Sequence, residues 1–143
     1  MRIMALDLGS VRVGVALSDE MGLTAGGLTV LKRDPQDEFL RNLKELSREH
    51  NCGRIVLGLP RRMDGSLGPE AQRVLALARD IEACLGLPVE TWDERLSTVA
   101  VEKVLLQADL SRRKRKKVID KVAAAYILQS YLDYLAAKGK TEA

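Results

Sequence analysis

The sequence contains few aromatic residues, little histidine or cysteine and no long apolar run, and each shortage narrows the possible functions. Aromatic residues make up 3% of the 143 positions, so we expect an aliphatic core without several exposed rings for base stacking. The only histidine, His50, and the two cysteines, Cys52 and Cys84, show no zinc-ligand spacing. The same shortage argues against Ser-His-Asp or Cys-His catalysis, because every such arrangement would need His50.

The chain also offers no sign of a membrane or secretory segment. Its longest apolar run covers residues 122–128, which is far too short to cross a bilayer. The opening residues, MRIMALDLGS, meet an acid at Asp7, so no signal peptide is visible. The cysteines are expected to be reduced thiols. The sequence therefore predicts a cytoplasmic protein that does not contact a membrane, and it leaves the oligomeric state open.

The positive charge of the chain is concentrated in one place. Lysine and arginine total 23 against 20 acids, giving a net charge of +3 and a pI near 9.0. Six consecutive cations occupy residues 112–117, and without them the remainder would be negative. A local basic patch on a mildly acidic body indicates a polyanionic partner held at one point. The alternative is a solvated basic loop.

The pattern of apolar residues predicts an α/β protein. We expect strands over residues 2–8, 12–18, 23–32, 54–59 and 88–93, with short turns between the first three. Asp34 and Pro35 are expected to cap and open a helix reaching His50, and Gly68-Pro69 opens one ending at Gly86. Further helices are expected over about 97–107 and 117–136. The predicted sheet is mixed, with three antiparallel strands followed by two parallel strands and helices on both faces.

Acidic residues stand at the ends of several predicted elements. Asp7 ends an apolar strand, Asp93 and Glu94 end the last strand, and Asp120 opens the last helix. Each has a structural explanation: Asp7 capping a turn, the second pair capping a helix or pairing with Arg95, and Asp120 favoured by the helix dipole. Strand alternation allows only one of Asp93 and Glu94 to face a given side, and it does not choose between them.

Taken together, these acids indicate a metal site. If they converge, their mutual repulsion has to be offset by divalent cations, and carboxylate oxygens favour Mg²⁺ or Mn²⁺ over zinc. A metal pair held by carboxylates is suited to phosphodiester cleavage.

Four segments in order resemble the YqgF/RuvX family: DLGSVRVGVALSD, VLGLPRRMDGS, PVETWDERLST and RKRKKVIDKVAAAYILQSYL. The resemblance implies an RNase H-like nuclease domain over residues 1–137, followed by a disordered tail over 138–143. It places the acidic triad on Asp7, Glu94 and Asp120, and so selects Glu94 over Asp93. Members of this family resemble Holliday-junction resolvases and are assigned to maturation of the 5′ end of pre-16S ribosomal RNA. RNA is therefore the expected partner, with branched DNA as a related substrate.

Cations near these motifs are expected to hold the nucleic-acid backbone without reading bases. They are Arg12, Arg61, Arg62, Arg95, Arg112, Arg113, Lys114, Arg115, Lys116 and Lys117. One alternative is a protein that binds RNA or a ribosome assembly intermediate and cuts nothing. Another is a sugar-kinase-like fold, which is disfavoured because the chain has one domain's length and no P-loop.

Overall fold

The chain folds in the element order that its sequence predicts, as far as the structure describes it. The computed structural model describes residues 1–94 and 112–142, with side chains for residues 1–94 and 120–139, so the helix expected over 97–107 lies outside the described residues. The elements are β1 (Arg2–Leu8), β2 (Arg12–Ser18), β3 (Ala25–Lys32), α1 (Gln36–Glu49), β4 (Cys52–Leu59), α2 (Pro69–Leu85), β5 (Val89–Asp93) and α4 (Arg112–Glu142).

The five strands form one mixed sheet in the order β3-β2-β1-β4-β5. β1 pairs antiparallel with β2, and β2 pairs antiparallel with β3. β4 lies parallel to β1 on its other side, and β5 lies parallel to β4. This arrangement confirms the predicted sheet of three antiparallel and two parallel strands. It also puts β1, the strand that carries Asp7, at the centre.

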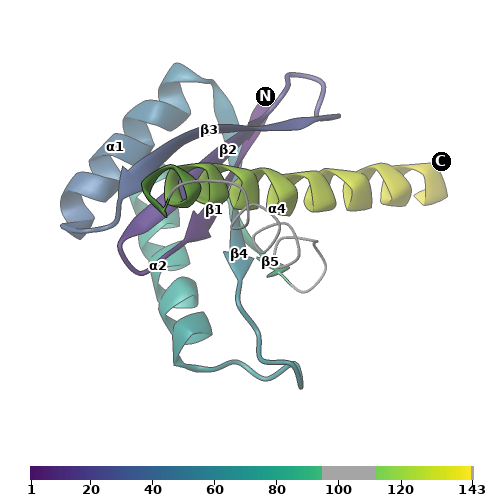
Figure 1. Ribbon diagram of the computed structural model, residues 1–143. Helices are drawn as coiled ribbons and strands as arrows, with labels where there is room; N and C mark the ends of the chain where they lie inside the picture. The colour runs from purple at the N-terminus through teal and green to yellow at the C-terminus, as the bar shows by residue number, and fades with distance from the viewer. Residues whose placement is uncertain (95–111, 143) are drawn as a thin grey trace.

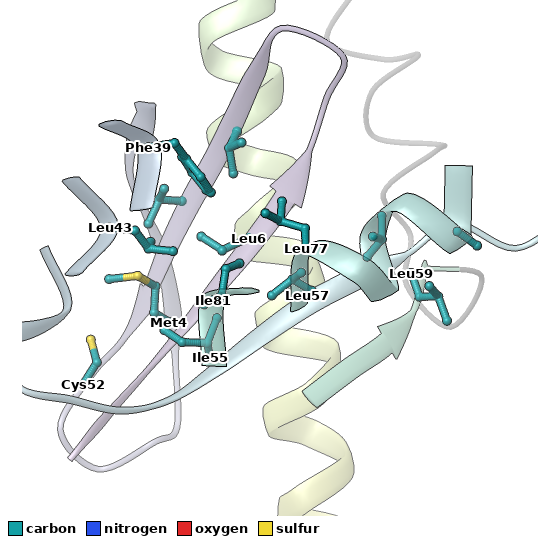
Figure 2. Close-up of a cluster of buried hydrophobic side chains, with 14 residues drawn as sticks. Met4, Leu6, Phe39, Leu43, Cys52, Ile55, Leu57, Leu59, Leu77 and Ile81 are labelled. Carbon is teal, nitrogen blue, oxygen red and sulfur yellow. The ribbon is translucent and has the colours of Figure 1, made fainter. Parts of the chain in front are cut away.

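Two apolar cores lie on opposite faces of the sheet. The first packs Phe39 and Leu43 of α1 and Ile81 of α2 against Leu6 and Leu57 (Figure 2). The second packs α4 against the small side chains on the other face of β1, β2 and β4. Among the described helices, Figure 1 shows α4 crossing that face, whereas α1 and α2 lie together on the other. Because strand side chains alternate, each strand residue can be assigned to one of these faces.

The predicted boundaries of α1 and α2 differ in accuracy. α2 begins at Pro69 and ends before Gly86, whose φ of +67° is the left-handed conformation common at helix ends. At α1, Pro35 rather than Asp34 is the N-cap, and no side chain caps the helix by a hydrogen bond. The predicted cap at Asp34 is therefore wrong. The helix begins at Gln36, one residue later than expected, and Pro35 itself has an extended backbone.

The last helix is longer than its sequence suggested. We expected residues 117–136 followed by a disordered tail over 138–143, but the helix runs from Arg112 to Glu142. The basic run therefore forms its first turns, and helical backbone continues through most of the expected tail. Arginine, lysine and alanine are strong helix formers, and a single glycine such as Gly139 costs only about 1 kcal/mol.

Hydrogen bonds and packing fix α4 over the sheet. Ala124, Ile127 and Tyr131 are fully buried, as the predicted inward face requires. The Tyr131 hydroxyl donates to Glu90 and accepts from Arg54, and the Trp92 ring nitrogen donates to Ser130 at 3.1 Å. Burial raises the pKa of Tyr131, so its hydroxyl keeps its proton. In the described part of the chain, no helix has the length and apolar character needed to cross a membrane.

Candidate active site

Asp7 lies on the face of the sheet that α4 covers. Ala5, two residues earlier on β1, belongs to the core beneath α4, whereas Leu6 belongs to the opposite core. Alternation therefore directs Asp7 toward α4. Its side chain is only 7% exposed, near the end of the central strand. A carboxylate so placed needs polar or cationic partners, because its desolvation is costly.

A glycine on each neighbouring strand flanks Asp7. Gly14 of β2 is its direct antiparallel partner. On the other side, Leu6 pairs with Leu57 of β4, so Asp7 and Gly58 each stand one residue beyond that pair. Gly14, Asp7 and Gly58 thus form a row across three strands. The two glycines leave the row without side chains at either end, which opens space above the sheet on both sides of Asp7.

Asp120 occupies the space above Gly14. A Cβ on this glycine would lie 2.0 Å from the carbonyl oxygen of Asp120, so the backbone of α4 rests directly on β2. The Asp120 carboxylate faces Arg12, whose Nε lies 3.5 Å from its Oδ2. Arg12 and Asp120 also line a hollow of about 130 Å³ together with the β1–β2 turn. The backbone of Asp120 therefore lies over Gly14, the strand partner of Asp7.

Glu94 occupies the space above Gly58. Its Oε1 lies 2.7 Å from the position that a Cβ on Gly58 would take, and Ile127 of α4 lies at 2.6 Å. Trp92, two residues before Glu94, packs in the core beneath α4. Glu94 thus reaches from the end of β5 over β4, toward Asp7. All three predicted acids therefore lie over one face of the sheet, in adjacent positions.

Asp93 faces the other way. Val89, four residues earlier, packs with the core beneath α1 and α2, so alternation directs Asp93 to that side. Its Oδ2 lies 3.7 Å from Nε of Arg61. Strand alternation alone left open which of the two acids faces α4, and the packing of β5 puts Glu94 on that side and Asp93 on the other.

The three acids do not form a preassembled metal centre. Within the described residues, no group of three or more His, Cys, Asp or Glu side chains is arranged to hold a metal ion. None of the three, however, lies on the opposite face of the sheet, an arrangement that would have ruled out a shared ion. Asp7, Glu94 and Asp120 also have interactions with neighbouring groups, of which the Arg12 ion pair is one.

The structure describes the side chains of only some of the cations that are predicted to contact nucleic acid. Arg12 is part-exposed beside Asp120. Arg61 and Arg62 lie in the loop after β4, where the Arg62 guanidinium packs over Gly68. The backbone of residues 112–117 opens α4 ahead of Asp120, but the side chains of this run and all of Arg95 lie outside the described residues.

Sequence reasoning missed the part that Gly58 and Arg33 play in the site. Gly14 and Gly58 make room for Asp120 and Glu94, and each lies in a strand whose other residues are mostly buried. Arg33 donates to the Gly9 carbonyl at 2.7 Å and holds the turn after Asp7. A glycine inside an apolar strand signals close approach of another group, and this signal was present at residues 14 and 58.

Comparison with known proteins identifies the family. Residues 1–134 match the family model RuvX, described as Holliday junction resolvase. The chain belongs to the RuvX family. It is 57% identical over 139 residues to a protein of Moorella thermoacetica, covering 97% of this chain and 99% of the relative. A Clostridium kluyveri protein is 50% identical, covering 95% and 99%. Both carry the name "Putative pre-16S rRNA nuclease".

Solved structures confirm the RNase H-like fold predicted for this RuvX family member. Thermus thermophilus RuvC, solved with a Holliday junction substrate, has a TM-score of 0.59 at 16% identity, covering 94% of this chain and 96% of RuvC. The fowlpox virus resolvase, solved with Holliday junction DNA, has a TM-score of 0.56 at 15% identity, covering 94% and 99%. At these identities the likeness establishes the shared fold.

Proposed function

We propose that this RuvX family member is a cytoplasmic, metal-dependent nuclease that hydrolyses phosphodiester bonds during processing of the 5′ end of pre-16S ribosomal RNA. The observation that carries the proposal is the row of Gly14, Asp7 and Gly58, with Asp120 above one glycine and Glu94 above the other. The names of the relatives point to the same chemistry. The nuclease domain in this proposal spans residues 1–137.

Asp7, Glu94 and Asp120 are the residues that would hold the metal. Their donors are carboxylate oxygens, which suit Mg²⁺ or Mn²⁺. When bound, such ions activate water and stabilise the oxygens of a phosphodiester undergoing displacement. The Asp120 carboxylate already faces one cation, the Arg12 guanidinium. The same guanidinium is part-exposed, so Arg12 would be placed to contact a substrate phosphate beside the residues that hold the metal.

The protein's own groups supply the surroundings of the reaction. Asp7 is almost fully buried at the centre of the sheet, where electrostatic interactions are stronger than in water. Arg12 stands at the open side of the same site. We propose that the basic residues 112–117 follow the substrate backbone, since they open the helix that carries Asp120. These contacts would position the substrate without specifying its sequence.

A second candidate function relies on the basic residues alone. A protein that binds RNA or a ribosome assembly intermediate without cutting it would use the basic run that opens α4 and the part-exposed Arg12. These basic residues would then serve recognition alone. Metal binding separates the candidates, because only the nuclease requires a cation that Asp7→Asn removes.

The decisive experiment compares three substrates side by side in Mg²⁺ or Mn²⁺: precursor 16S rRNA, a four-way DNA junction and a plain duplex. We expect cleavage of the precursor at its 5′ side and no cleavage by Asp7→Asn. If the junction is cleaved and the precursor is not, the proposed substrate would be branched DNA in place of precursor rRNA. Tight binding without cleavage in either metal would favour the second candidate.

A further inference from the structure

The loop between β4 and α2, residues 60–68, carries the most exposed large apolar side chain in the described part of the protein. Met63 is 99% exposed at its tip. Figure 1 shows this loop projecting away from the sheet and helices. Single exposed apolar residues are common on protein surfaces, so exposure alone assigns no role. The conformation of the loop and its position relative to the acids supply the argument.

The turn around Met63 is closed by its own hydrogen bonds. The Arg62 amide donates to the Ser66 carbonyl at 3.0 Å, and the Gly65 amide donates to the Arg62 carbonyl at 2.8 Å. Asp64 accepts from both the amide and the hydroxyl of Ser66, at 2.9 and 2.7 Å. Gly65 has a φ of +88°, which other residues rarely adopt. Met63 is therefore presented by an ordered turn.

The loop is also tied to the end of β5, which directly precedes Glu94. Arg61 donates to the Gly65 carbonyl at 3.1 Å, and its Nε lies 3.7 Å from Oδ2 of Asp93. Asp93 immediately precedes Glu94. One side chain thus links the base of the loop, its tip and the end of β5. A duplex or strand lying along the acids would meet this loop at the same end of the sheet.

The charges beside Met63 suit a polyanion. Arg61 and Arg62 directly precede it, and the acid that follows it, Asp64, accepts hydrogen bonds from Ser66 within the turn. Proteins that hold a phosphate backbone with arginine can insert an apolar residue, methionine among them, between neighbouring bases. Insertion costs unstacking energy, which is smallest where bases are already unpaired.

We propose that Met63 is an apolar wedge that inserts against bases at a break in stacking, such as a bulge, an unpaired end or a junction. The proposal rests on the proposed function, because the acids must engage the same nucleic acid. It names the substrate class: nucleic acids whose continuous helix is interrupted near the scissile phosphate, rather than uninterrupted duplexes. Arg61 and Arg62 would hold the flanking phosphates while Met63 occupies the gap.

The test measures binding without cleavage, in the full chain carrying Asp7→Asn, with Mg²⁺ present. Two RNA duplexes of the same sequence are used, one continuous and one with a single-nucleotide bulge beside a 2-aminopurine reporter. Met63→Ser is compared with Met21→Ser, because Met21 is 79% exposed in the distant β2–β3 turn and provides a matched control. Met63→Leu tests whether apolar character suffices.

For Met63→Ser we expect binding of the bulged RNA to weaken roughly five- to tenfold, about 1–1.4 kcal/mol. The fluorescence rise that reports unstacking should shrink as well. Affinity for the continuous duplex, the Met21→Ser control and the Met63→Leu variant should stay at the parental level. Equal losses on both RNAs, or an unchanged fluorescence rise, would overturn the wedge. If the parent bound neither RNA, the proposed function itself would fail.

Discussion

Gly58→Ala should displace the Glu94 side chain and so lower activity, with only a small loss of fold stability. A methyl group at residue 58 would lie 2.6 Å from Cδ1 of Ile127 and 2.7 Å from Oε1 of Glu94. Ordinary contact begins at 3.4 Å, so these atoms have to move by about 0.8 and 0.7 Å respectively. Both belong to the far ends of flexible side chains, so the backbone can stay in place.

The expected costs for activity and stability differ in size. A displacement of about 1 Å in a catalytic group can reduce the rate roughly a hundredfold. Crowding of Ile127 is expected to lower the unfolding free energy by about 1–3 kcal/mol at most. Replacing glycine by alanine raises it by about 0.4–1 kcal/mol, because the unfolded chain loses conformational freedom. We therefore expect cleavage to fall about tenfold to a hundredfold while unfolding free energy falls by about 1 kcal/mol.

Two other glycines provide the comparison. A Cβ at Gly26 of β3 meets no atom within 4 Å, so Gly26→Ala should leave cleavage unchanged and raise the unfolding free energy by about 0.4–1 kcal/mol. A Cβ at Gly14 would lie 2.0 Å from the Asp120 carbonyl, so α4 itself would have to move by about 1.4 Å. Gly14→Ala should therefore lose both activity and stability, the latter by about 1–3 kcal/mol or more.

The measurements are urea unfolding followed by circular dichroism, and single-turnover cleavage under conditions where each variant is folded. Gly58→Ala with parental cleavage would refute the placement of Glu94 in the reaction. A loss of more than about 3 kcal/mol, matching Gly14→Ala, would show that crowding disturbs the packing of α4 and not Glu94 alone.

Three further predictions concern the charged groups. Isosteric amides at Asp7, Glu94 or Asp120 should abolish metal-dependent cleavage. They should leave the urea midpoint unchanged or raise it, because clustered like charges destabilise the metal-free protein. A lowered midpoint for all three variants would contradict this. Arg12→Lys should weaken RNA affinity, because lysine cannot form the bidentate phosphate contact. Unchanged affinity with a lowered melting temperature would assign Arg12 to its ion pair with Asp120 alone. Replacing residues 112–117 by Gln or Ser should weaken binding of all nucleic acids equally and reduce the slope of log K against log salt by about 2–4 units. An unchanged slope in anisotropy titrations would make the run a solvated helix face.

Much of the fold could be predicted because its signals are local. Alternating or continuous apolar runs set the strands, and Gly68-Pro69 and Gly86 set both ends of α2. The inward face of α4 followed from helical periodicity, which puts Ala124, Ile127 and Tyr131 on one side. The ends of α4 were harder, because good helix formers continue past the predicted limits on both sides.

The sequence by itself determined which residues are available for chemistry: acids at the ends of strands, one histidine too isolated for catalysis, and a single basic run. It also predicted an acid at the start of the last helix, but Asp120 lies two turns inside α4, which begins at Arg112 and has no acid in its first turn. The pattern of β5 did not determine which of its two acids lies on the α4 side, and only the resemblance to a family favoured Glu94 there. The tertiary structure puts Glu94 on that side, over Gly58, and Asp93 on the other, because the side of β5 is set by packing against α4 and not by anything local to that strand. Only the tertiary structure assigned Gly14 and Gly58 their purpose, because the space a missing side chain leaves has meaning only once α4 and Glu94 lie across it.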